Sequence, residues 1–343
     1  MLDAPHTPNP ALVHGGPDAH GVPAHDFSTN SNACGPCPIA MQAVRQADAK
    51  HYPDPHYTEL RARLAQWHGV SLERVVLAAS GSEFIRRIST WARLHAEASS
   101  TGAAQVHWPE HAYGEYAHAA QAVGLSPTQD RTQAALIWVC APSSPMGQTD
   151  VGGIEAVQAL RAHQHLVFDL AYEPLRLSGQ LDVLKHTARD RVWQMWTPNK
   201  ALGMTGVRGA YAIAPLHASG VVQQLQALAP SWVLGGHAVA MLTAWTHDDV
   251  QQWLQDTLHI LRAWKAQQVA LCQSLGWQVA PSEANYFCAQ LPQLKSTPWH
   301  TLREHGVKLR DATSFGLPGW VRVGVLPPES QRALAAAWQK VAA

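Results

Sequence analysis

The chain has 343 residues, enough for one large domain with a smaller one or for two domains of similar size. Hydrophobic residues make up 46% and charged residues 15%, which is typical of a soluble globular protein. The formal net charge is zero, so no field over the whole surface would attract nucleic acid or anionic lipid. No apolar run reaches the roughly 18 residues of a membrane-spanning helix, and residues 1–21 do not resemble a signal peptide. We therefore expect a cytoplasmic protein with no nucleic-acid or membrane partner.

The first 70 residues are predicted to hold loops and two helices. Residues 1–50 are rich in Gly and Pro and end in a short helix from about Ile39 to Ala49. The segment that follows reads as a turn and an amphipathic helix, with Leu60, Leu64 and Trp67 at helical spacing.

Between about residues 75 and 215, apolar strands alternate with helices. This alternation indicates a parallel or mixed sheet covered by helices on both faces, and ligands of such sheets lie at the carboxyl ends of the strands. Helices are then predicted over about 217–275, and strands around one helix after that, which indicates a smaller α+β layer. The segments predicted to contain the strands of the first region are 74–80, 103–110, 134–142, 165–174, 190–198 and 208–215.

Cys34 and Cys37 form a Cys-Gly-Pro-Cys motif, which raises the hypothesis of a redox or metal site. A redox pair needs its first cysteine at the start of a helix after a strand, whereas here a loop precedes the motif and Pro38 follows it. There is no second C-x-x-C to complete a zinc site, and the 20 histidines are scattered. We predict no metal site, and thiol chemistry remains a weaker alternative.

Lys200 stands in an unusual setting, because it follows a Thr-Pro-Asn turn and precedes Arg208 and an apolar segment. An amine near a buried arginine and a phosphate can lose its proton readily enough to form a Schiff base with an aldehyde. The small turn at 80–82 stands between a strand and a helix, where free N–H groups can hold a phosphate. Asp169 ends an apolar strand, where a carboxylate needs a cation or a donor, although a helix N-cap would also explain it. Together with Tyr172, this order of residues predicts pyridoxal phosphate (PLP) as the cofactor.

These segments resemble the fold-type-I PLP-dependent aminotransferases of class I and II, in particular histidinol-phosphate aminotransferase and threonine-phosphate decarboxylase. The likeness runs from about His14 to the C-terminus. It implies an α/β fold with a large domain, in which a mostly parallel seven-stranded sheet lies between helices, and a smaller α+β domain. The implied ranges are 1–45 for the N-terminal arm and part of the small domain, 46–235 for the large PLP-binding domain, and 236–343 for the small C-terminal domain.

The resemblance also implies roles around the cofactor. Lys200 would form the Schiff base, Asp169 would keep the ring nitrogen protonated so that the ring is an electron sink, and Tyr172 would bond the phenolic oxygen. Tyr113 would stack on the ring. Tyr52 would reach the phosphate of the partner subunit's cofactor, which implies a homodimer with shared active sites. The other cofactor-binding residues implied are Ser80, Gly81, Ser82, Ser144, Thr197 and Arg208.

For the substrate, the resemblance places Arg322 where an arginine binds the α-carboxylate as a bidentate pair. Arg310 would be a second substrate-binding arginine, unless it only forms a surface ion pair. The "VHGG" segment resembles a His-Gly-Gly of the decarboxylases whose histidine contacts substrate phosphate. His14 is therefore a candidate, with Asn30 beside it, and a solvated histidine is the alternative. Two arginines and a histidine suit a small-molecule substrate with two anionic groups.

Three positions depart from the family pattern. Ser144 replaces an asparagine that bonds the phenolic oxygen, Asn199 stands where serine or threonine is common, and Leu170 stands where glutamate is common. We expect an aminotransferase that acts on an L-amino acid or a phosphorylated amine. The alternatives are a threonine-phosphate decarboxylase and a pseudoenzyme that binds PLP without turnover, because the sequence leaves open which bond at Cα is broken.

Overall fold

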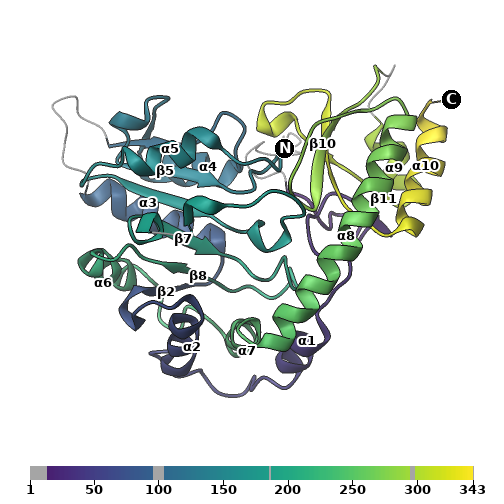
Figure 1. Cartoon of the computed structure of the whole chain (residues 1–343). Coiled ribbons are helices and arrows are strands. Elements are labelled where there is room, and N and C mark those ends of the chain that lie inside the picture. Colours follow the sequence, from purple (N-terminus) through teal and green to yellow (C-terminus); the bar gives the residue numbers. More distant parts are fainter. Residues whose placement is uncertain (1–13, 96–103, 185–186, 294–297, 343) are drawn as a thin grey trace, which may run out of the picture.

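The computed structural model describes residues 14–95, 104–184, 187–293 and 298–342, so residues 1–13 of the predicted N-terminal arm lie outside the described residues. A seven-stranded sheet with the order β2-β8-β7-β6-β5-β3-β4 lies in the larger part of the molecule (Figure 1). All its strand pairs are parallel except the two that β8 makes with β2 and β7, which confirms the predicted mostly parallel sheet. The strands are β2 Val75–Ala78, β3 Gln105–His107, β4 Ser126–Pro127, β5 Leu136–Cys140, β6 His165–Asp169, β7 Trp193–Trp196 and β8 Ala210–Ile213.

Helices cover both faces of this sheet because its central strands are apolar on both sides. On β5, Leu136 and Trp138 pack in one core with α3, α4 and α6, while Ile137 and Val139 pack on the opposite face near α5. The same second face carries α1, α2 and α7 over β2 and β8. The helices are α1 Pro38–Arg45, α2 Thr58–His68, α3 Gly81–His95, α4 Gly114–Val123, α5 Val151–Gln158, α6 Ser219–Ala227 and α7 Gly236–Trp245.

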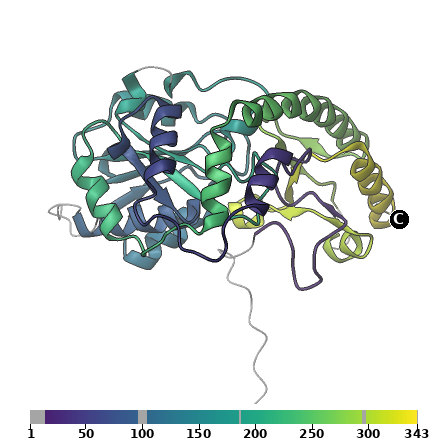
Figure 2. The same cartoon turned by 90° about the horizontal axis from the view of Figure 1, so that it is seen from below.

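The smaller part is an antiparallel sheet with the order β12-β13-β10-β9, packed against helices (Figures 1 and 2). Strand β1 of the N-terminal arm pairs with β11 of this part. The strands are β1 His25–Asp26, β9 Gln278–Val279, β10 Tyr286–Gln290, β11 Val307–Lys308, β12 Arg310–Asp311 and β13 Trp320–Gly324, and the helices are α8 Asp248–Ser274, α9 Trp299–Glu304 and α10 Pro328–Ala342.

The long helix α8 joins the two parts of the molecule. Leu254 and Leu261 of its first half pack in the core with α1 and α7, whereas Cys272 near its end packs in the core of the smaller part. The predicted domain boundaries at 45/46 and 235/236 stay predictions. In the described ranges, no helix combines the length and the hydropathy that a membrane crossing requires.

Candidate active site

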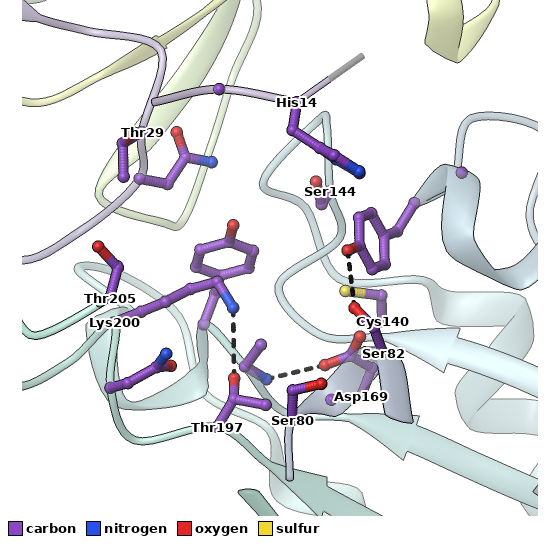
Figure 3. A pocket seen from close by; sticks show the side chains of 18 of the residues that line it. His14, Thr29, Ser80, Ser82, Cys140, Ser144, Asp169, Thr197, Lys200 and Thr205 are labelled. Atoms are coloured by element: carbon purple, nitrogen blue, oxygen red, sulfur yellow. Dashed lines mark hydrogen bonds between the residues drawn. The ribbon is translucent and has the colours of Figure 1, made fainter. Parts of the chain in front are cut away.

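A cavity of about 340 Å³ lies where the carboxyl ends of β2, β5, β6 and β7 meet the N-terminal arm and the smaller part. Its volume falls within the usual range for small-molecule sites, and its position is the one expected for an α/β sheet. Every predicted site residue except Tyr52 lines it. Figure 3 shows Ser80, Thr197 and Asp169 on one side of the cavity, and His14 and Ser144 on the opposite side.

Lys200 follows β7 and points into this cavity. Its Nζ donates to Thr197 Oγ1 at 3.4 Å and lies 5.2 Å from the centre of the Tyr172 ring (Figure 3). Burial lowers the pKa of the Lys200 amine, and the charge of Arg208 adds to this, while Asp169 opposes it. From the sequence we assume a buried arginine beside the lysine. That assumption is wrong, because the Arg208 side chain lines the cavity from an exposed position.

The Cys-Gly-Pro-Cys loop supports the backbone around Lys200. Asn32 N–H donates to the Lys200 carbonyl at 2.9 Å, and Cys37 N–H donates to the Leu202 carbonyl at 2.8 Å. A Cβ on Gly35 would lie 3.0 Å from the Gly203 Cα, so the two loops touch through their backbones. Burial raises the pKa of the Cys34 thiol to about 11, opposite to the shift of a reactive cysteine. Among the described residues, no group of three or more His, Cys, Asp or Glu side chains could hold a metal ion.

The N-terminus of α3 faces the cavity with free donors. Ser80 caps the helix, since its Oγ accepts from the Glu83 N–H at 3.1 Å. The N–H groups of Gly81 and Ser82, in the first turn, have no acceptor within the helix. A Cβ on Gly81 would lie 2.9 Å from Thr197 Cγ2, so only glycine lets these two segments come this close. The result is a small polar concavity with the positive end of a helix dipole behind it.

Asp169, at the end of β6, is 4% exposed and belongs to the cavity lining. Its carboxylate accepts two hydrogen bonds, from the Tyr116 hydroxyl at 2.7 Å and from the Ala171 N–H at 3.0 Å. Burial raises the pKa of Asp169, while the Tyr116 hydrogen bond and the Lys200 charge oppose the rise. The Ala171 bond closes a local turn and is not the helix N-cap of the alternative reading, because the next helical segment begins at Glu173 with Tyr172 as its N-cap. Tyr116 is a residue of this site that could not be predicted from the sequence, because its local pattern is that of a core tyrosine.

The opposite side of the cavity carries two arginines from β12 and β13. Arg322 donates from Nη1 to Ser144 Oγ at 3.0 Å and from Nη2 to the Ser28 carbonyl at 3.1 Å. Arg310 donates to Ser314 Oγ at 2.7 Å, and its guanidinium lies 4.8 Å from the centre of the Phe315 ring. Burial, followed by the charge of Arg322, lowers the pKa of Arg310 to about 10. Both guanidinium groups line the cavity, where an anion could bind between them.

His14 of the N-terminal arm lines the cavity from an exposed position, and its ring lies 6.3 Å from that of Tyr113. Partial burial lowers the pKa of His14, Glu115 opposes the change, and the cavity arginines add to it. Asn30 is buried in the lining, and neither atom of its amide has a hydrogen-bond partner among the described residues. The Asn30 amide is thus available to a group bound in the cavity, and it lies close enough to the Tyr172 hydroxyl to oppose the rise in the pKa of Tyr172 that burial causes.

Tyr52 lies outside the cavity. It is 77% exposed, and its ring stacks on Trp232 with the ring centres 4.5 Å apart and an angle of 26° between the planes. The predicted role of Tyr52 requires a second copy of the chain, so its position outside its own cavity agrees with that role and does not test it.

Comparison with known proteins identifies the family. A profile of aminotransferase class I and II matches residues 89–337, which is well over half of the chain. The chain therefore belongs to this family, and it is a PLP-dependent transferase.

The most informative relatives are histidinol-phosphate aminotransferases. The one from Jannaschia sp. (strain CCS1) is 28% identical over the full length of both chains. The one from Akkermansia muciniphila is 25% identical over 92% of this chain and 90% of its own length. Among solved structures, histidinol-phosphate aminotransferase from Sinorhizobium meliloti, in complex with PLP, has a TM-score of 0.79 at 22% identity, covering 99% of this chain and 98% of that one. L-threonine-O-3-phosphate decarboxylase from Porphyromonas gingivalis has a TM-score of 0.69 at 19% identity. The match covers 88% of this chain and 91% of the decarboxylase chain. At these identities the solved structures establish the fold, as predicted.

Proposed function

We propose that the chain is an aminotransferase that acts on an L-amino acid or a phosphorylated amine, with PLP bound in the cavity and attached to Lys200. The observation that carries this proposal is the meeting of Lys200 and Asp169 in one cavity with the free N–H groups of α3. An amine of lowered pKa, a buried carboxylate and an anion-binding helix end are the three groups that an aldehyde-bearing pyridine phosphate requires. The relatives named histidinol-phosphate aminotransferase support the same reaction class.

The residues of the cavity fit the parts of PLP. The turn Ser80–Ser82, together with Thr197 and Arg208, would hold the phosphate. Asp169 would bind the ring nitrogen. Tyr172 would bind the phenolic oxygen, with Ser144 on the same side of the cofactor, and Tyr113 would stack on the ring. Glycine at position 81 lets the N-terminus of α3 lie close against Thr197, so that the N–H groups of the helix and the Thr197 hydroxyl would reach the same phosphate.

When bound, PLP supplies an electron sink for the bond that breaks at the substrate Cα. The protein residues supply attachment, orientation and proton movement. Lys200 would be both the attachment point and the base that moves a proton at Cα, because burial lowers the pKa of its amine. Arg322 would hold the α-carboxylate in a bidentate pair, and Arg310 with His14 would hold a second anionic group.

A second candidate, decarboxylation of a threonine-phosphate-like substrate, is favoured by the structure of the His-Gly-Gly segment. A Cβ on Gly15 would lie 2.0 Å from the Ser28 carbonyl oxygen, and Gly16 has φ +98° and donates to Ser28 Oγ at 2.8 Å. Both glycines are thus required to bring His14 to the cavity mouth. A PLP-binding pseudoenzyme is the third and weakest candidate.

Product analysis separates these candidates. The PLP-loaded protein is incubated with histidinol phosphate and a panel of 2-oxo acids, and separately with threonine phosphate. Amino transfer without release of CO₂ supports the aminotransferase, release of CO₂ supports the decarboxylase, and a bound cofactor without either product indicates the pseudoenzyme. Borohydride reduction followed by peptide mapping should label Lys200, and Lys200→Ala should lose the label and keep the fold. A label on another lysine, or none, would overturn the proposal.

A further inference from the structure

Tyr116 contacts the centre of the proposed site from inside the protein. It lies on α4 with no exposed surface, and its hydroxyl donates to Asp169 Oδ2 at 2.7 Å. The proposed function uses Asp169 to bind the cofactor ring and gives Tyr116 no part. A hydrogen bond between two buried side chains from different elements, one of them a charged carboxylate, calls for an explanation.

Packing fixes the direction of the Tyr116 hydroxyl. The ring stacks on Trp138 of β5 with the centres 4.6 Å apart and 11° between the planes. The edge of the ring meets Tyr113, with the centres 5.8 Å apart and 86° between the planes. These ring contacts do not depend on the hydroxyl, so they hold the ring in place without it. They also direct the hydroxyl at the end of β6 before any ligand binds.

The two bonds that Asp169 accepts define the plane of its carboxylate, since Oδ2 faces Tyr116 and Oδ1 faces the Ala171 N–H. The other titratable groups around it are Cys140, its strand neighbour on β5, with Tyr172 and Lys200. Burial raises the pKa values of the Cys140 thiol and the Tyr172 hydroxyl, so both stay neutral. Lys200 and Tyr116 then remain as the side chains that favour an ionised Asp169.

In the proposed function, Lys200 no longer favours an ionised Asp169 through a free ammonium group, which leaves Tyr116. Once Lys200 is attached to the cofactor, its amine no longer provides a free ammonium charge beside Asp169. The Tyr116 hydroxyl then becomes the main side-chain donor that offsets the burial of the carboxylate. A hydrogen bond to a charged group is worth roughly 1.5–3 kcal/mol, which corresponds to about ten-fold or more in an equilibrium.

We infer that Tyr116 is a positioning residue, which holds the Asp169 carboxylate in the ionised, oriented form that binds the ring nitrogen of the cofactor. This inference rests on the proposed function. Tyr116 makes no contact with the cofactor itself in this arrangement, and it acts through Asp169.

The test compares binding of two ligands to the cofactor-free protein: PLP, and the PLP analogue in which a C–H group replaces the ring nitrogen. Both carry the same aldehyde and phosphate, so the ratio of their dissociation constants isolates the contact between the ring nitrogen and Asp169. We expect the wild type to prefer PLP, and Tyr116→Phe to reduce this preference about ten-fold, mainly by weakening PLP binding. Absorbance or tryptophan-fluorescence titration measures both constants without any turnover.

Tyr211→Phe is the matched control. Tyr211 is equally buried, and its hydroxyl bonds His68 Nε2 at 3.0 Å and Trp245 Nε1 at 3.1 Å, but it does not line the cavity. Its removal should cost stability as any buried hydroxyl does and should leave the ratio at the wild-type value. If Tyr116→Phe does not fold, replacement of Tyr116 by 3-fluorotyrosine keeps the ring and provides a more acidic donor, which should raise the preference for PLP.

The outcomes separate the two proposals. A wild type that binds both ligands equally would contradict the role of Asp169 and with it the proposed cofactor site. A wild type that prefers PLP, with Tyr116→Phe unchanged in this ratio, would overturn the inference on Tyr116 and leave the cofactor site standing. A loss of preference in both Tyr116→Phe and Tyr211→Phe would also overturn it, because the effect would then be a general consequence of losing a buried hydroxyl.

Discussion

Arg310 and Arg322 are direct cross-strand partners in the register of β12 and β13, and both side chains are at most 7% exposed. Like charges opposite each other on a sheet destabilise it, and burial adds the cost of removing both ions from water. The lowered pKa of Arg310 reflects the same strain, with burial as its first cause and Arg322 as its second. We predict that an anion binds between the two guanidinium groups and offsets this repulsion.

We predict that Arg322→Gln keeps or raises the melting temperature of the ligand-free protein, although most substitutions of buried residues lower it. The same variant should lose the stabilisation that added phosphate or a dicarboxylate gives the wild type. Thermal unfolding at matched ionic strength, with and without the anion, measures both effects.

The control for this prediction is Arg74→Gln. Arg74 is equally buried, but it has an anionic partner, since Nη1 donates to Asp190 at 2.7 Å and Nε donates to the Ala214 carbonyl at 2.7 Å. Its removal should destabilise the protein with or without added anions. If Arg322→Gln were as destabilising as Arg74→Gln, the arginine pair would be part of the structural framework and not a ligand site.

His68 provides a prediction on acid stability. Burial among Trp67, Trp196 and Tyr211 lowers the pKa of His68 from 6.5 to about 3. The unfolded chain therefore takes up a proton near pH 6.5, while the folded protein does so only near pH 3. Stability falls as the pH is lowered between these two values, because the unfolded state binds more protons there.

The slope of the unfolding free energy against pH is proportional to the number of protons that the chain takes up on unfolding. We expect His68→Gln to reduce this number by up to one. Urea unfolding at several values between pH 4 and pH 7 measures the slope. His217→Gln, at an exposed position, is the matched control. An unchanged slope in His68→Gln would show that His68 is not a source of acid sensitivity.

Tyr52 leads to a prediction on assembly. Its exposed stack with Trp232 presents a large aromatic surface, and the family resemblance places this tyrosine in the neighbour's site. Mixing Tyr52→Phe subunits with Lys200→Ala subunits should therefore restore activity. In the mixed dimer, one site carries both defects and the other carries neither. Activity that stays at the level of the separate variants, or a monomer in sedimentation that is active at low concentration, would contradict shared sites.

The part of the site that could be predicted from the sequence lies at strand ends. Asp169 ends β6 and Thr197 follows β7 because each apolar run stops there, and parallel strands bring their carboxyl ends to one edge of the sheet. Lys200 could be predicted as well, because it follows a Thr-Pro-Asn turn at the end of the same strand segment. The roles around the cofactor, by contrast, came from the resemblance to a family.

What could not be predicted depends on packing between distant segments. The Tyr116 hydroxyl meets Asp169 only because α4 packs over the end of β6, and nothing in the local pattern distinguishes it from a core tyrosine. Arg208 was expected to be buried and is exposed, since the exposure of a loop side chain depends on what the fold brings near it. The loop at Gly35 packs against the turn at Gly203, although these residues lie 168 positions apart in the sequence. No local sequence pattern predicts this contact.

Ser144 supports the last prediction, on the pH dependence of the bound cofactor. Its hydroxyl accepts from Arg322 Nη1 at 3.0 Å, so its single proton remains free to point elsewhere in the cavity. The family has an asparagine at this position, whose amide is a longer donor toward the phenolic oxygen of the cofactor. If Ser144 does not reach that oxygen, the anionic form of the oxygen loses a hydrogen bond worth roughly 1.5–3 kcal/mol.

Weaker stabilisation of the unprotonated form raises the pKa of the bound cofactor, by about one unit for each 1.4 kcal/mol. Ser144→Asn should therefore lower the pH at which the visible absorbance of the bound cofactor changes. Compensation by Tyr172 or by a bridging water would make the shift smaller. Ser143→Asn is the neighbouring control, because the Ser143 side chain accepts from the Gln148 N–H at an exposed position and does not line the cavity. Equal midpoints for wild type and Ser144→Asn would contradict the prediction and mean that neither side chain at position 144 reaches the phenolic oxygen. A higher midpoint would reverse the sign of the effect and show that the serine is the better donor of the two.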